Sequence, residues 1–96
     1  MKYQKVNLWL RVENNSKFVR GRKRSIEEIE EDVLSRYSMR KLHKDGWEYE
    51  LSIPYENDED LDDTVYDMIQ EMADIADSRH CFIEYDVTAV DSDRVW

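Results

Sequence analysis

Residues 5–13 place an aliphatic side chain at every second position. The aliphatic residues are Val6, Leu8, Leu10 and Val12. A period of two is typical of a β-strand that buries one face and exposes the other. Residues 14–16, Asn-Asn-Ser, then favour a turn. Residues 17–21 either return as the second strand of a hairpin or form a loop, and the pattern does not choose between the two.

A helical period replaces this alternation from residue 25 onward. Apolar side chains now recur three and four residues apart and share one face of a helix. They are Ile26, Ile29, Val33, Leu34 and Tyr37. Ser25 and Glu28 have the spacing of a capping box, in which each side chain bonds the backbone N–H of the other residue. We therefore predict a helix that begins at Ser25 and ends near Ser38, because Met39 no longer falls on the apolar face.

Two later segments alternate as strands. Residues 47–55 carry an aromatic or aliphatic side chain at every odd position, which is the clearest strand pattern in the chain. Pro54 has no backbone N–H for a neighbouring strand, so this strand either ends there or lies at a sheet edge. The last strand extends to residue 89. It places Ile83, Tyr85, Val87 and Ala89 on one side and Phe82, Glu84, Asp86 and Thr88 on the other.

Between these strands, residues 58–78 predict an amphipathic helix about 30 Å long. Its apolar side chains span about 120° of the helix circumference. They are Leu61, Val65, Met68, Ile69, Met72, Ile75 and Ala76. The opposite side carries five carboxylates over about 21 Å, which we call the acidic row: Asp60, Asp63, Asp67, Glu71 and Asp74.

The elements follow in the order strand, undecided hairpin strand, helix, strand, helix, strand. Crossovers between strands of one sheet are right-handed almost without exception, so both helices should cover the same face of the sheet. We therefore expect an α+β fold, a two-layer sandwich of ferredoxin-like character with a three- or four-stranded sheet. Ninety-six residues support one hydrophobic core, and the whole of residues 1–96 is predicted to form a single domain.

Charge is distributed unevenly along the chain. Its net charge is −9, but residues 1–24 hold eight basic side chains and one acidic, while residues 47–96 hold two basic and sixteen acidic. The negative total should repel nucleic acids and membrane surfaces at long range. Cys81 is the only cysteine, which excludes an internal disulfide and favours a cytoplasmic setting. No apolar run approaches the roughly 20 residues of a membrane span.

Several kinds of catalytic or metal site are excluded by the sequence. Two glycines are too few for a phosphate-binding loop. His80 and Cys81 are adjacent, and neighbours on an extended chain point to opposite faces and cannot act as base and nucleophile. A calcium loop starting at Asp58 would have Asp63 where glycine is required and Ile69 where glutamate is required. We therefore expect no enzyme activity, no cofactor and no metal.

Glu30 falls inside the apolar face of the first predicted helix. It either lies at the rim and pairs with a cation or is a buried carboxylate with a raised pKa. One candidate acid without a partner acid, base or metal does not make an active site.

The acidic row has two interpretations. Like charges three and four residues apart weaken an isolated helix, so helix design alone does not explain them. They either keep a small apolar-rich protein in solution or imitate a phosphate backbone that a basic protein would bind. Imitation would need further acids on the same side of the molecule: Glu27, Glu31, Glu48, Glu50, Glu84 and Asp86.

Two further surfaces are candidates for binding. The basic cluster, Arg20, Arg22, Lys23 and Arg24, suits phosphate contact, although acids elsewhere in the chain could neutralise it. Trp9 and Phe82 should both lie on the sheet face that the helices leave open. An exposed aromatic pair there indicates a partner site or a homodimer, unless Trp9 lies flat beneath long charged side chains.

The sequence favours a small acidic cytoplasmic interaction protein. In its most concrete form, the acidic row and the aromatic pair bind a basic, nucleic-acid-handling protein, as an inhibitor, immunity protein or antitoxin does. One alternative is a nucleic-acid-binding module that uses the basic cluster. Another is an accessory subunit of a larger complex with no activity of its own.

Overall fold

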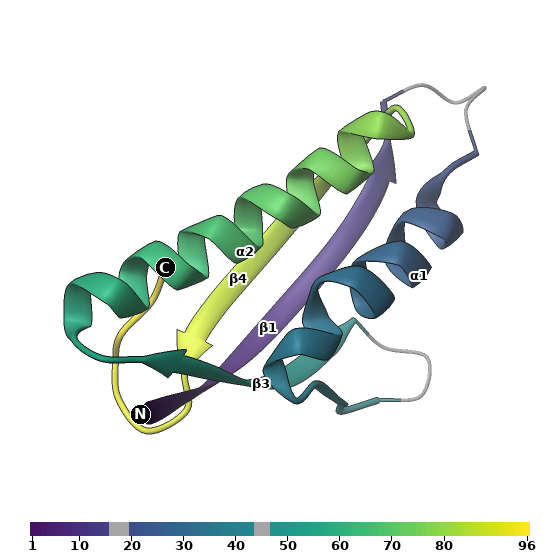
Figure 1. Ribbon diagram of the computed structural model, residues 1–96. Coiled ribbons are helices and arrows are strands. Elements are labelled where there is room, and N and C mark those ends of the chain that lie inside the picture. Colours follow the sequence, from purple (N-terminus) through teal and green to yellow (C-terminus); the bar gives the residue numbers. More distant parts are fainter. Residues whose placement is uncertain (16–19, 44–46) are drawn as a thin grey trace.

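The structure is a computed structural model that describes residues 1–15, 20–43 and 47–96. It combines a four-stranded sheet with two α-helices (Figure 1). In chain order the elements are β1 (Lys2–Asn14), α1 (Arg22–Asp32), a 3-10 turn (Leu34–Tyr37), β2 (Arg40–Lys41), β3 (Glu48–Tyr55), α2 (Asp58–Ser78) and β4 (Cys81–Ala89). The predicted α+β class is confirmed.

The sheet has the order β2-β3-β1-β4, and every neighbouring pair is antiparallel. The long central strand β1 pairs with β3 along residues 2–9 and with β4 along residues 6–14. Because β3 and β4 are both antiparallel to β1, they run parallel to each other on either side of it. The helix α2 therefore carries the chain across β1 from β3 to β4.

The fourth strand is not the one that the sequence left undecided. Residues 17–19 lie outside the described part of the chain, and Arg20 and Gly21 are not in a strand. The additional strand is instead Arg40–Lys41, which pairs with Tyr49 and Glu50. Two residues are too short to show any periodicity, so this strand gave no sequence signal. Because β2 is so short, β3 has no outer neighbour at Pro54, as the proline indicated.

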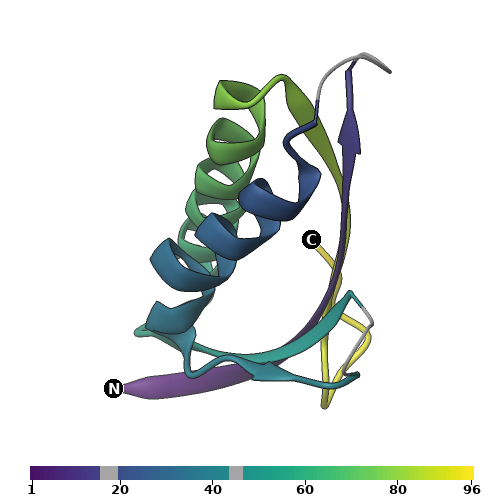
Figure 2. The same ribbon diagram turned by 90° about the vertical axis from the view of Figure 1, so that its right-hand side faces the viewer.

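The core fills the space between the helices and the sheet. Figure 2 shows α1 and α2 side by side, with the strands curving beneath them and up the right-hand side of the view. The buried side chains are the alternating aliphatic residues of the strands and the apolar stripes of the helices. They include Val6, Leu8, Leu10, Val12, Ile29, Tyr49, Leu51, Ile53, Leu61, Val65, Met68, Met72 and Val87.

The helix α2 has the predicted bounds. Its start is capped by Asn57, whose side-chain oxygen accepts a hydrogen bond of 2.9 Å from the backbone N–H of Asp60. The first turn is acidic, with Asp58, Glu59 and Asp60 near the positive end of the helix dipole. The Asn57 cap and the helix dipole both stabilise the start of α2, where the apolar period begins.

The predicted start of α1 was wrong. The helix begins at Arg22, and its cap is Gly21, with no capping side chain. A side chain at position 21 would come within 2.8 Å of the carbonyl oxygen of Arg79, so only glycine allows this close approach. Ser25 is fully buried in the first turn and cannot serve as an exposed cap.

The corrected start places three cations, Arg22, Lys23 and Arg24, in the first turn of α1, where a helix dipole disfavours positive charge. We predict that Lys23→Glu raises the free energy of unfolding by about 0.3–1 kcal/mol, as measured by urea denaturation. The neutral control Lys23→Gln should give a smaller gain. A loss of stability in Lys23→Glu would show that Lys23 has a stabilising partner.

Candidate functional site

The acidic row lies together on the exposed side of α2, opposite the buried apolar stripe. Asp63, Asp67, Glu71 and Asp74 are exposed, and Asp60 is partly buried. The sequence prediction that these carboxylates point away from the core is therefore confirmed. They form one continuous negative edge along the helix.

Three members of the row are used within the molecule. Glu71 forms an ion pair with Arg36 on the 3-10 turn. Asp60 accepts a 2.9 Å hydrogen bond from the backbone N–H of Glu56, and Asp74 accepts one of 2.9 Å from the side-chain amide of Gln70. The hydrogen bond to Glu71, followed by its negative charge, raises the pKa of Arg36. Glu71 is thus the most neutralised carboxylate of the row.

Among the described residues, three exposed carboxylates of the row are not paired with a cation. Within residues 1–15, 20–43 and 47–96, Asp63, Asp67 and Asp74 have no ion-pair partner. Three uncompensated negative charges therefore follow one another along about 16 Å of helix. They are the part of the row that is available to a partner.

The remaining acids do not all join this edge. Glu27 and Glu31 are exposed on α1, in the helix layer beside α2 (Figure 2). Glu48, Glu50, Glu84 and Asp86 alternate with inward-facing residues of β3 and β4, so they lie on the sheet face away from the core. Among the described residues the acids are divided between two faces, so these residues do not form the single dense field that imitation of a phosphate backbone requires.

The basic cluster surrounds the first turn of α1 and borders a cavity of about 510 Å³ that Asn14 and Gly21 also line. Arg22 lies 3.5 Å from Glu13. Arg20, Lys23 and Arg24 form no ion pair within the described residues, and the nearby acid Glu28 pairs with Arg79 at 2.7 Å. The cluster therefore stays largely cationic.

The two aromatic residues of the outer sheet face are not adjacent. Trp9 lies opposite Glu48 and Asp86, whereas Phe82 lies opposite Glu13. They are four positions apart along β1, which is about 13 Å along the strand. Phe82 is 43% exposed, but Trp9 is partly covered. The prediction of one aromatic patch was wrong because alternation fixes a side chain's face and not its position along the sheet.

Two further ion pairs involve the strands. On the outer sheet face, Lys5 of β1 lies 3.9 Å from Glu50 of β3. Glu30 lies 3.7 Å from Lys41, so it is the rim carboxylate and not a buried acid. Burial, with the neighbouring charge and hydrogen bond of Glu30, raises the pKa of Tyr49.

Sequence reasoning missed the C-terminal segment, residues 94–96, which adds to the outer edge of β4. Backbone hydrogen bonds join Ala89 N–H to the carbonyl of Arg94 at 2.9 Å and Trp96 N–H to the carbonyl of Val87 at 3.0 Å. Thr88 and Val95 form the bridge between these bonds. The segment is thus a short antiparallel strand that covers one end of the β4 edge.

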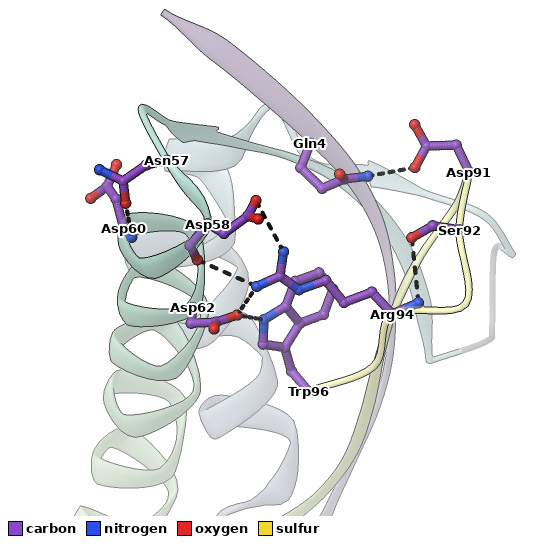
Figure 3. A network of polar contacts seen from close by, with 9 residues as sticks. All are labelled: Gln4, Asn57, Asp58, Asp60, Asp62, Asp91, Ser92, Arg94 and Trp96. Carbon is purple, nitrogen blue, oxygen red and sulfur yellow. Dashed lines mark hydrogen bonds and ion pairs between the residues drawn. The ribbon is translucent and has the colours of Figure 1, made fainter.

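Side chains fix this segment to α2 (Figure 3). Arg94 lies 3.4 Å from the carboxylate of Asp58 and also binds Asp62. The indole N–H of Trp96 donates to Asp62 at 2.8 Å, and the Arg94 guanidinium lies 5.2 Å from the Trp96 ring centre. The Trp96 hydrogen bond and then Arg94 lower the pKa of Asp62. The sequence does hold one signal for this segment, because Arg94 is one of only two basic residues after residue 46.

No group of metal-ligating side chains occurs among the described residues, and no helix there is long and apolar enough to cross a membrane. Cys81 is buried at the start of β4. Comparison with protein-family models, curated proteins and solved structures finds no match to this chain.

We predict that Asp62→Asn loosens the C-terminal segment because it removes the charge that Arg94 binds. The Trp96 indole N–H resonance should move toward its unfolded position and exchange faster with water in NMR spectra. Asp63→Asn, the neighbouring carboxylate that does not touch the segment, is the control and should leave the resonance in place. An unchanged resonance in Asp62→Asn would mean that backbone pairing alone holds the segment.

The same contact has a defined pH dependence. The pKa of Asp62 lies below its ordinary value of 3.8, so the carboxylate stabilises the folded segment above that pH and loses its effect as pH falls through the lowered pKa. In an acid titration of the wild type, the midpoint of the Trp96 indole transition should therefore lie below pH 3.8. A transition above that pH would contradict the contact.

Proposed function

We propose that this chain is a non-catalytic binding protein that captures a basic, nucleic-acid-handling protein through the acidic row of α2. The observation that carries the proposal is the line of exposed carboxylates Asp63, Asp67 and Asp74, which no cation of the described residues neutralises. Their mutual repulsion weakens the helix and is relieved when a cationic surface binds. An inhibitor, immunity or antitoxin-like role is the most concrete form of this function.

The proposal includes a rigid support and a location. A ferredoxin-like sandwich with both helices over one sheet face would present α2 as a straight rod of about 30 Å. Such a rod would hold the carboxylates in fixed positions before a partner arrives, which reduces the ordering cost of binding. A free buried cysteine, Cys81, supports placement in the cytoplasm.

The second candidate function is nucleic-acid binding by the basic cluster. It is favoured by one observation: Arg20, Lys23 and Arg24 lack ion-pair partners among the described residues and lie around a cavity at a helix start. Backbone N–H groups at a helix start also attract phosphate. Against it stands the net charge of −9, which opposes the approach of any polyanion. We therefore rank it below partner capture.

We predict that the triple variant Asp63→Lys, Asp67→Lys and Asp74→Lys loses capture of the basic partner. The measurement is a quantitative pull-down from the native cell, with bound proteins identified by mass spectrometry. Recovery should fall by at least about tenfold, since reversed charges oppose both encounter and docking. The matched control Glu56→Lys, Asp91→Lys and Asp93→Lys changes net charge equally at exposed positions outside the row and should retain capture.

Salt and polyanions separate the two candidate functions. Capture by the row should weaken as sodium chloride rises, because exposed charges are screened. Heparin or RNA should not bind the wild type measurably. If heparin instead binds tightly, and the double variant Arg22→Glu and Arg24→Glu abolishes that binding, the proposal is overturned and nucleic-acid binding is favoured.

A further inference from the structure

The outer edge of β4 is only partly covered. In an antiparallel pair, backbone N–H and C=O groups of alternate residues point to alternate sides of the strand. The bonds of Val87 and Ala89 to residues 94–96 show that odd-numbered residues of β4 point outward, and the register with β1 continues without a bulge to Cys81. The backbone groups of Ile83 and Tyr85 therefore point outward too, and they have no partner among the described residues.

A groove of about 530 Å³ runs beside this open stretch, between β4 and α2. One wall is formed by Ile69, Ala73 and Asp77 of α2, and the other by Ile83 and Tyr85 of β4. Tyr85 is 39% exposed although it lies on the inner face of the strand. Unpaired strand edges beside such a groove accept an extended peptide as an extra strand.

The chain itself shows how an extended segment pairs with the neighbouring stretch of this edge. Residues 94–96 occupy the neighbouring stretch of the same edge as an antiparallel strand. Arg94 and Trp96 turn toward α2 and contact its carboxylates, while Val95 points away and is exposed. The groove lined by Ile83 and Tyr85 continues from this docked segment along the same two elements.

Charge selects the occupant of the open stretch. Asp74 and Asp77 lie on its helix side, and Glu84 and Asp86 on the outer face of β4. A second copy paired edge to edge would bring these acids against their own counterparts, with a net charge of −9 on each molecule. Like charges across a strand pair are destabilising. A basic segment would instead place cations beside these carboxylates, and opposite charges across a strand pair are stabilising.

We propose that the β4 edge at Ile83 and Tyr85 binds an extended, basic segment of a partner protein as an additional strand. This inference rests on the proposed function and specifies how the basic partner is held. Backbone bonds to Ile83 and Tyr85 supply the pairing, and alternate side chains of the segment enter the groove against Asp74 and Asp77. The acidic row then contacts the folded body of the same partner.

The probe is a blocked hexapeptide of alternating arginine and valine, titrated into the wild-type protein and followed by NMR and calorimetry. The largest amide shifts should occur at Ile83 and Tyr85. Two further peptides carry N-methyl groups on all arginines or on all valines, so that each lacks the N–H groups of one strand edge. One of these two should bind at least about tenfold more weakly, because it loses the bonds to β4, and the other should bind like the parent.

Equal weakening by both N-methylated peptides would overturn strand addition, since purely electrostatic binding does not distinguish the two edges. A blocked peptide of alternating glutamate and valine should not bind. If it binds as well as the arginine peptide, the inferred charge selection is wrong. All these outcomes are obtained with the unaltered protein, so none depends on a variant folding.

A protein variant tests the groove. Ala73→Trp fills it and should weaken the arginine peptide at least about tenfold by steric exclusion. The matched control Ser35→Trp, at an exposed position on the 3-10 turn, should bind normally. The inference would be overturned if the peptide does not bind and ultracentrifugation shows a concentration-dependent dimer that Ala73→Trp dissociates. That result would assign the edge to a second copy.

Failure of this inference is distinct from failure of the proposed function. If Ala73→Trp still captures the basic partner while the Asp63, Asp67 and Asp74 reversal does not, the row functions and the β4 edge does not. If the reversal leaves partner capture intact, the proposed function fails, whatever the peptides do.

Discussion

The packing of the α2 apolar stripe onto the sheet is the contact on which the rest of this structure depends. Burying each large side chain of the stripe stabilises the fold by about 1.5–3 kcal/mol, and Leu61, Val65, Met68 and Met72 are almost fully buried. Each pair of like charges on the opposite side costs only about 0.2–0.5 kcal/mol. Packing therefore outweighs repulsion by a wide margin, and the helix can hold a line of carboxylates that it could not hold as an isolated peptide.

This packing also determines which charges are free. Three described cations near α2 form ion pairs. Arg36 pairs with Glu71, Arg79 pairs with Glu28 on α1, and Arg94 pairs with both Asp58 and Asp62. Such exposed pairs contribute little to stability, but they decide position. They tie the 3-10 turn, the start of β4 and the C-terminal segment to the helices. Which carboxylates remain without a cation therefore depends on the fold and cannot be read from the composition.

The sequence predicted those elements that are long enough to show a hydrophobic period. Residues 58–78 have a long apolar period and an acidic first turn, so even the bounds of α2 were correct. The start of α1 was missed because it depends on the close approach of Gly21 to Arg79, far away in the chain. Strand β2 and residues 94–96 are too short for any period. The acidic row could be listed from sequence, but its pairing and the open edge of β4 depend on register and long-range contacts.

An open strand edge normally promotes aggregation, and proteins protect such edges with charges or by covering them. Here residues 94–96 cover one end of the β4 edge, and Glu84 and Asp86 flank the rest. Protection alone would explain these charges if they opposed every partner, but carboxylates of a single sign oppose only an acidic or neutral apolar strand. They leave the edge accessible to a basic one. The arrangement that prevents self-association of an acidic protein is therefore also the one that selects a cationic strand.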